Sequence, residues 1–344
     1  MTRATPARSL ALIVALGLGL TACSGSSEPA ADAEAAAGTT DPATITLYTS
    51  EPQEKIDAVV AAFNEEHPEI TVEVFRAGTG DLTARIESER TSGEVQADVL
   101  LAADAATFEG YKDADLLAPY SPADADAINP DVVDPDGFYV GTRIIPTVIA
   151  YNTTMVDSPP TSWQDLTDPQ YAGKITMPNP DVSGAAAYNA AVWFGTPELG
   201  EPWLEELAAN EPVIAESNGP VSQAVASGTQ PVGVVVDYLV RDLAAAGSPI
   251  AVSYPSEGVP FVAQPAGIFA DSDEPEASAA FIDFLVSEAG QTLAVEQSYL
   301  PVRNDVGTPE GAPAMDDLAV LNPPLDEVTA TKEQAVARFN ELFS

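Results

Sequence analysis

The amino-acid sequence predicts an α/β fold of about two domains. Strand-like and helix-like segments alternate from residue 44 onward, which favours parallel strands joined by right-handed crossover helices. The chain has 344 residues, which corresponds to about two domains at roughly 150 residues each. Hydrophobic residues make up 45% of the chain, so a sizeable core can form.

The charge and the scarce reactive residues exclude several classes of protein. The 53 acidic and 13 basic residues give a formal net charge of -40, which repels nucleic acids and anionic membranes. The single cysteine, Cys23, excludes an internal disulfide and a thiolate zinc site. The single histidine, His67, argues against a multi-histidine metal site and a Ser-His-Asp hydrolase, and no Gly-x-Ser-x-Gly elbow is present. We therefore expect that the protein is not an enzyme and that it has no cofactor and no nucleic-acid partner.

The first 22 residues have the pattern of a signal peptide. Arg3 and Arg8 precede an apolar run over residues 10–20, which is too short to cross a membrane. The run ends in Leu-Thr-Ala followed by Cys23, an arrangement that resembles the lipobox of bacterial lipoproteins. The alternative is an ordinary signal peptide with an incidental cysteine. The lipobox is favoured because the only cysteine stands where the pattern requires it.

Residues 23–43 then form a predicted lipidated tether. Residues 24–43 are small, polar and acidic, and such a segment cannot bury enough surface to offset its ordering entropy. We expect the mature protein to be lipid-anchored through Cys23 on the outer face of the cytoplasmic membrane. Cleavage before Cys23 leaves 11 basic and 53 acidic residues, and therefore a charge of -42.

The first half of the remaining chain contains three predicted strands, at residues 45–48, 70–75 and 98–101. Ser50 is a candidate N-cap for a helix in which Ile56, Val59 and Phe63 fall at helical spacing. Residues 78–81 open the next helix. Ligands of such sheets bind beyond the carboxyl ends of the strands, which here are residues 49–51, 77–81 and 102–104.

The second half repeats this alternation. Strand patterns occupy residues 144–151, 174–177, 213–215, 232–236 and 250–254. Helices are expected to start after Ser183, after the cap Ser217-Asn218 and after Asp237, and residues 327–343 form a predicted amphipathic helix at the C-terminus.

The order and spacing of these segments resemble the extracellular solute-binding proteins of bacterial ABC importers. The segments ITLYTSEPQEKIDAVVAAFNEEHPEI and EASAAFIDFLVSEAGQTLAVEQSYLPVR carry the resemblance, which covers nearly all of residues 44–306. The nearest branch contains the ferric-ion-binding proteins. It implies the type II periplasmic-binding-protein fold, in which each of two lobes is a mostly parallel sheet flanked by helices and two crossing strands form the hinge. The implied lobes are residues 44–146 with 262–310 and residues 147–261, followed by a C-terminal helical tail at 311–344.

The iron ligands of that branch are mostly replaced in this chain. The resemblance places its tyrosine pair on Tyr238 and Leu239 and its histidine on Pro52. It places its glutamate at or next to Ala103, one position before Asp104. Only Tyr238 matches, so ferric iron would depend on Glu51 and Asp104 as substitutes. No metal site is therefore expected, and ferric iron is the alternative ligand, with Tyr238 as its matching residue.

In contrast, the residues that hold an anion beside the metal in that branch are present in this chain. The resemblance implies that Ser183, Gly184 and Ala185 hold an anion at a helix start, together with Asn218. Thr79 and Gly80 provide a second helix start with exposed N–H groups. Some relatives in this branch take up sugar phosphates or aminoalkylphosphonates.

We therefore expect a small phosphorylated or phosphonate-bearing organic solute that is delivered to ABC permease subunits by a monomeric protein. Glycine at 184 is expected to let the phosphate approach the backbone closely. The solute's remaining groups would meet Tyr238 and nearby carboxylates, and whether these accept from an ammonium or from hydroxyls is left open. A sensor domain is the rival class. The expected ligand-binding residues are Ser50, Glu51, Thr79, Gly80, Asp104, Ser183, Gly184, Ala185, Asn218, Asp237, Tyr238 and Glu257.

Overall fold

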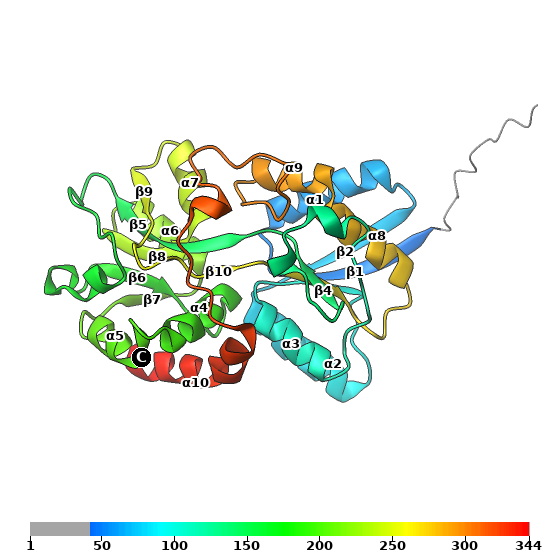
Figure 1. Cartoon of the computed structure of the whole chain (residues 1–344), viewed down its shortest axis with the longest axis horizontal. Helices are drawn as coiled ribbons and strands as arrows, with labels where there is room; N and C mark the ends of the chain where they lie inside the picture. The colour runs from blue at the N-terminus through cyan, green and yellow to red at the C-terminus, as the bar shows by residue number, and fades with distance from the viewer. Residues whose placement is uncertain (1–41, 344) are drawn as a thin grey trace, which may run out of the picture. The chain divides into compact units, whose positions relative to one another are not determined.

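The computed structural model describes residues 42–343, so the signal segment, Cys23 and nearly all of the expected tether lie outside the described residues. Their strands form two sheets, which Figure 1 shows side by side with helices on both faces. An α/β fold is therefore confirmed. No helix within residues 42–343 is long and apolar enough to span a membrane.

The first sheet has five strands in the order β2-β1-β3-β11-β4. We call this sheet and its helices the first lobe. Its strands are β1 (Ala43–Thr49), β2 (Ile70–Arg76), β3 (Val99–Leu101), β4 (Tyr139–Gly141) and β11 (Pro265–Ile268). Its helices are α1 (Gln53–Glu66), α2 (Thr79–Ser92), α3 (Ala105–Asp113), α8 (Pro275–Val286) and α9 (Glu288–Glu296).

The second sheet has six strands in the order β10-β5-β8-β6-β7, with β9 also paired to β5. We call this sheet and its helices the second lobe. Its strands are β5 (Ile145–Asn152), β6 (Ile175–Pro178), β7 (Val213–Ala215), β8 (Val232–Val236), β9 (Ile250–Ser253) and β10 (Phe261–Val262). Its helices are α4 (Gly184–Gly195), α5 (Gly200–Ala208), α6 (Asn218–Ala226), α7 (Asp237–Ala245) and α10 (Leu325–Phe343). Short 3-10 helices lie at Ala125–Ala127, Pro130–Val132, Gln164–Thr167, Pro169–Tyr171 and Met315–Asp317.

Both sheets are mixed, which corrects the expectation of mostly parallel sheets. Strands β1, β2 and β3 pair in parallel, but β11 is antiparallel to β3 and β4. In the second lobe β6 is parallel to β7 and β8, whereas β5 is antiparallel to β8, β9 and β10. The antiparallel pairings all involve β5 or β11. These are the strands that follow a passage of the chain from one lobe to the other, and the passage sets their direction.

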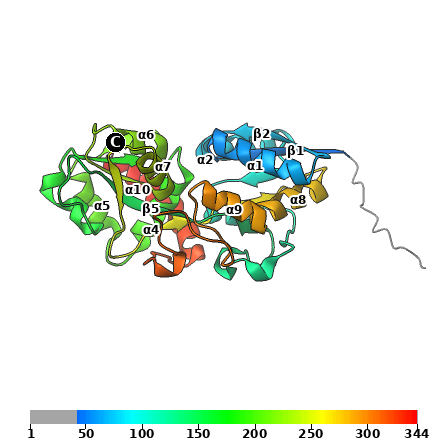
Figure 2. The same cartoon turned by 90° about the horizontal axis from the view of Figure 1, so that it is seen from above.

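Apolar side chains on both faces of the first sheet explain its helices. Helix α1 buries Ile56, Val59 and Phe63 at helical spacing, and these pack with α8 on one face. Helices α2 and α3 cover the other face through residues such as Leu82 and Phe108. Figure 1 shows the two groups of helices on opposite sides of β1 and β2, and Figure 2 shows α1, α8 and α9 from above.

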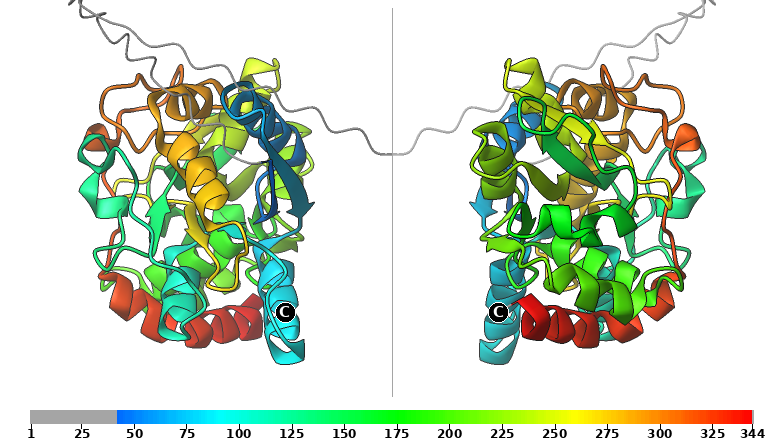
Figure 3. Two further views of the ribbon diagram at one scale, coloured as in Figure 1. Left: turned by 90° about the vertical axis from the view of Figure 1, so that its right-hand side faces the viewer. Right: turned by 90° about the vertical axis from the view of Figure 1, so that its left-hand side faces the viewer.

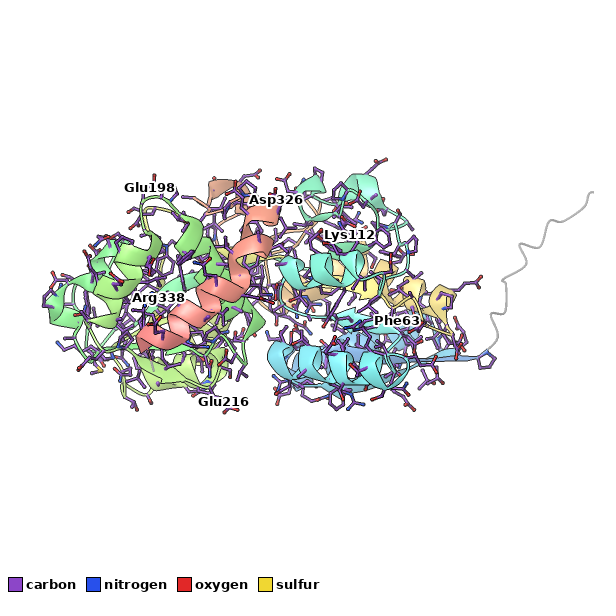
Figure 4. All side chains as sticks on the ribbon, turned by 90° about the horizontal axis from the view of Figure 1, so that it is seen from below. Phe63, Lys112, Glu198, Glu216, Asp326 and Arg338 are labelled. Carbon is purple, nitrogen blue, oxygen red and sulfur yellow. The ribbon has the colours of Figure 1, made fainter. Side chains whose placement is uncertain are left out.

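Helix α10 contacts both lobes. Its buried Phe339 packs among the tryptophans of the second lobe, and Arg338 pairs with Glu201 of α5 at 2.6 Å. Near the middle of α10, Lys332 donates to Thr107 of α3 in the first lobe at 2.9 Å. Figures 3 and 4 show α10 along one side of the molecule, with Arg338 over the second lobe. The predicted C-terminal helix is therefore present and longer than residues 327–343.

Candidate functional site

A cavity of about 580 Å³ has walls from both lobes. Five helices begin at it, because its lining includes the residue before the first turn of each of α1, α2, α4, α6 and α7. These residues are Pro52, Gly78, Ser183, Ser217 and Val236. A helix start exposes N–H groups that lack intrahelical partners and carries partial positive charge. The convergence therefore makes the cavity favourable for anions.

Four of these five helix starts have no side-chain cap. The cap residues of α1, α2, α6 and α7 accept no hydrogen bond through a side chain from the first helical turn. This differs from the expected N-cap at Ser50, since α1 begins at Gln53 and Pro52 occupies the cap position. Asn218, which was also expected to cap a helix, is itself the first residue of α6.

Eight of the twelve expected ligand-binding residues line the cavity, from both lobes and all five helix starts. They are Ser50, Glu51, Thr79, Ser183, Gly184, Ala185, Asn218 and Tyr238. Gly80, Asp104, Asp237 and Glu257 do not line it.

Two of those four residues have their polar groups satisfied within the fold. The Gly80 N–H donates to the Val182 carbonyl oxygen at 3.3 Å. The buried Asp104 carboxylate caps α3 by accepting from the Thr107 N–H at 2.9 Å, and it pairs with Lys332 of α10. These contacts leave neither Gly80 nor Asp104 available in the roles expected from the sequence.

The other two also have partners within the protein. Asp237 is buried in the first turn of α7, where its carboxylate pairs with Arg241. Burial raises the pKa of the Asp237 carboxyl to about 6, although the Arg241 charge opposes this shift. Glu257 lies in a turn and accepts from the Gln164 N–H at 3.2 Å. It also accepts from the Ser256 hydroxyl at 3.2 Å.

Ser183 and Asn218 join three of the helix starts. The Ser183 Oγ accepts from the Ala186 N–H at 3.3 Å and from Asn218 Nδ2 at 3.0 Å. Asn218 Oδ1 accepts in turn from the Val236 N–H at 3.3 Å. A hydroxyl oxygen has two acceptor lone pairs and one proton to donate. Since both lone pairs are engaged, the Ser183 hydroxyl proton is left for a ligand.

Arg76 is a cation in the cavity lining that the sequence reasoning missed. It is the last residue of β2, and its Nε donates to the Glu51 carbonyl oxygen at 3.2 Å. Its terminal nitrogens make no hydrogen bond within residues 42–343, so they can pair with an anion. The position could have been found, because Arg76 directly precedes residues 77–81 at the end of a parallel strand.

One side of the cavity contains a buried polar network around Glu51. The Glu51 carboxylate accepts from the Tyr299 hydroxyl at 2.6 Å and from Gln264 Nε2 at 2.8 Å, and lies 3.1 Å from the Arg143 guanidinium. Glu51 is 1% exposed, so its charge is neutralised by protein groups. Sequence reasoning missed Arg143, Gln264 and Tyr299, which lie far from Glu51 along the chain and carry no local motif.

Two tyrosines lie in contact beside this network. The ring centroids of Tyr238 and Tyr299 are 4.5 Å apart, and Lys55 Nζ lies 4.9 and 4.8 Å from them. Burial and the nearby Glu51 charge hold the pKa of both phenols well above the usual value. Both phenols are therefore neutral hydrogen-bonding groups in this cavity.

Comparisons with known proteins agree with this geometry. Residues 95–324 match the family model described as bacterial extracellular solute-binding protein. The chain belongs to this family. A Salmonella typhimurium protein named a putative 2-aminoethylphosphonate-binding periplasmic protein is 26% identical over 298 residues, which cover 79% of this chain and 83% of the relative. A probable ABC transporter periplasmic-binding protein of Sinorhizobium fredii is 26% identical over 62% of each chain.

Solved structures of this type share the fold. Iron-bound HitA from Pseudomonas aeruginosa is 24% identical with a TM-score of 0.76, covering 88% of this chain and 99% of that one. AfuA from Actinobacillus pleuropneumoniae with fructose-6-phosphate bound is 20% identical with a TM-score of 0.77, covering 88% and 96%. The type II periplasmic-binding-protein fold is thereby confirmed for this solute-binding protein.

Proposed function

We propose that this protein is the receptor of an ABC importer for a small organic phosphate or phosphonate. The convergence of five helix starts on one cavity carries the proposal, because four of them have first-turn N–H groups without a side-chain cap. Arg76 adds a formal positive charge, and the Ser183 hydroxyl adds a donor. The cavity volume of about 580 Å³ lies within the usual range for small-ligand sites.

Under this proposal, specific groups of the protein donate hydrogen bonds to the solute. The phosphoryl oxygens accept from N–H groups at Gly184 and Ala185, from the Ser183 hydroxyl and from Arg76. Thr79, at the start of α2, contributes from the first lobe. The remainder of the solute meets Tyr238 and the Glu51 side of the cavity. Glu51 contributes mainly by positioning Tyr299 and Gln264, since both of its oxygens already accept hydrogen bonds.

The Salmonella relatives support an organic solute, whereas HitA, which shares the fold, was solved with iron. The curated relatives from Salmonella are named for 2-aminoethylphosphonate, and AfuA was solved with fructose-6-phosphate. We further propose that Cys23 anchors the protein to the outer face of the membrane and that the loaded protein docks as a monomer on its permease. These last points concern residues and partners outside the described structure.

Ferric iron is the second candidate, on one specific observation. Tyr238 and Tyr299 are neighbours in space, so a second phenol is present although Leu239 follows Tyr238 in sequence. The surrounding charges oppose iron, because Arg143 neutralises Glu51 and Lys55 lies over both rings. Residues 42–343 contain no group of three His, Cys, Asp or Glu side chains that could hold a metal. We therefore rank iron second.

A ligand screen followed by one matched pair of variants tests the proposal. Calorimetric titration is made with 2-aminoethylphosphonate, fructose-6-phosphate, inorganic phosphate and ferric citrate. We expect a phosphorus compound to bind and Arg76→Gln to weaken it roughly ten- to a hundredfold, since hydrogen bonds to charged groups contribute about 1.5–3 kcal/mol. Arg90→Gln is the control, because Arg90 lies on α2 outside this cavity and pairs with Glu87.

Two results would contradict the proposal. Binding of ferric citrate alone would favour the iron alternative. Equal loss of phosphonate affinity in Arg76→Gln and Arg90→Gln would mean that general charge, and not this cavity, determines binding.

A further inference from the structure

Two chain segments from opposite lobes meet at the edge of the cavity. Residues 78–80, at the start of α2 in the first lobe, contact residues 181–184, just before and at the start of α4 in the second. The Gly80 N–H donates across this contact to the Val182 carbonyl oxygen at 3.3 Å. Backbone therefore meets backbone directly between the lobes.

Glycines make this close approach of the two segments possible because they have no side chain. A Cβ at Gly80 would stand 1.9 Å from the Asp181 carbonyl oxygen, and one at Gly78 would stand 2.9 Å from the Val182 oxygen. A Cβ at Gly184 would stand 2.8 Å from three side-chain atoms of Thr79. None of these three glycines has a positive φ, so the requirement is for space and not for backbone conformation.

This explanation differs from the one that the sequence suggests for Gly184. There the glycine was expected to make room for a phosphate, whereas in the structure the atoms nearest to its missing side chain belong to Thr79 of the other lobe. Gly80 likewise uses its N–H across the lobes. Both segments nevertheless border the cavity, since Thr79 and Gly184 line it.

We propose that Gly78, Gly80 and Gly184, with Thr79, form the closing contact by which this protein shuts its lobes over a bound anion. The inference rests on the proposed solute-binding function. Closure brings the starts of α2 and α4 together, and both are the positive ends of helix dipoles. Like ends repel, so the contact is disfavoured while the cavity is empty. An anion between them offsets this repulsion, which couples binding to closure.

A double-mutant cycle tests the positioning role of Gly184. Gly184→Ala is expected to weaken 2-aminoethylphosphonate, or another probe bound by the wild type, by roughly ten- to a hundredfold through overpacking. In a Thr79→Gly background the same substitution is expected to cost less than about threefold, because the atoms it meets are gone. A glycine needed for phosphate approach would give the same loss in both backgrounds, and that result overturns the inference.

Scattering adds a readout of closure itself. The radius of gyration of the full chain is expected to fall when the probe binds to the wild type, and to stay at the open value for Gly80→Ala, whose Cβ would meet backbone. Gly110→Ala is the folding control, since Gly110 in α3 has nothing within 4 Å of its missing Cβ and has no positive φ. Equal compaction of Gly80→Ala and wild type contradicts the proposal.

A cysteine pair separates this inference from the proposed function. Asp81→Cys with Val182→Cys, made in a full chain carrying Cys23→Ser, is expected to cross-link within one chain under mild oxidation, because both side chains lie beside Gly78 and neither substitution adds a Cβ at a packed glycine. The single variants are not expected to do so. If no phosphorus compound binds but the pair still cross-links, the function is wrong and the contact stands. If the pair never cross-links, with or without a probe, the contact is not formed and the inference fails.

Discussion

Ser183 offers the most direct test of the anion site at the scale of single residues. Its hydroxyl accepts two hydrogen bonds inside the protein and keeps its proton for a ligand. Ser183→Ala is expected to weaken the cognate solute by about 1.5–3 kcal/mol, or roughly ten- to a hundredfold. Calorimetric titration against the best ligand of the screen measures the loss.

Ser287→Ala is the matched control for that variant. Ser287 caps α9 by accepting from the Gly290 N–H at 3.0 Å, and it does not line the cavity. Both variants lose a helix cap, which costs about 1 kcal/mol of stability. Only Ser183→Ala should lose affinity. Unchanged binding in folded Ser183→Ala would place the anion elsewhere.

The two cavity phenols allow a test for iron. We expect no intense visible absorption band when ferric citrate is added, because Lys55 and Arg143 occupy the surroundings that a ferric ion would need. A tyrosinate-iron band that disappears in Tyr238→Phe, but remains in Tyr254→Phe outside the cavity, would restore the iron alternative.

Single residues also mark the limit of prediction from sequence. Ser183, Gly184, Ala185, Asn218 and Thr79 could be placed at helix starts because short-range patterns identify helix starts. The partners of Glu51 could not be predicted in this way, since Arg143, Gln264 and Tyr299 come from three later segments. The same holds for Asp104, whose partner Lys332 lies on the C-terminal helix.

At the scale of elements, the alternation of strands and helices predicted the fold class but not every strand direction. Periodicity is a local property, so it located β1, β2 and β3 and the helices between them. The antiparallel pairing of β5 and β11 depends on how the chain crosses between lobes. Contacts such as that of Gly80 with Val182 also arise only after the lobes meet.

The first turn of α7 contains a group whose titration should affect stability. Asp237 is buried, and its pKa is raised to about 6 from the ordinary 3.8. A carboxyl with a raised folded-state pKa favours the protonated folded state, so its contribution is present below about pH 4 and is lost as the pH rises through about 6.

Asp237→Asn removes this dependence. The free energy of unfolding of the variant minus that of the wild type is expected to increase between pH 4 and 7, by at most about 3 kcal/mol. Urea unfolding at several pH values measures the difference, and all other carboxylates titrate in both proteins alike. A difference that stays constant or decreases over this interval would show that Arg241 keeps Asp237 ionised throughout.

At the scale of the whole molecule, anchoring depends on residues outside the described structure. The single cysteine after Leu-Thr-Ala predicts that Cys23→Ala abolishes lipidation. The variant should be released or retain its signal segment. Metabolic labelling with a fatty-acid probe decides this, and equal labelling of wild type and variant would exclude Cys23 as the site.

The net charge creates a conflict with an anionic ligand that kinetics can resolve. A formal charge of -40 repels a phosphate ester at long range, whereas the helix starts and Arg76 attract it only nearby. Salt shortens the screening length from about 30 Å at 0.01 M to about 8 Å at 0.15 M. Screening should therefore weaken the repulsion more than the short contacts.

We accordingly expect the association rate constant of fructose-6-phosphate, if it binds, to rise severalfold over that range of salt. The rise should be smaller for 2-aminoethylphosphonate, because its ammonium offsets part of the negative charge. Stopped-flow fluorescence at matched viscosity measures both rates. A rate that falls with added salt would mean that the positive groups around the cavity already steer the ligand from a distance. In that case the field at the cleft is positive, and the acidic surface has no part in ligand capture.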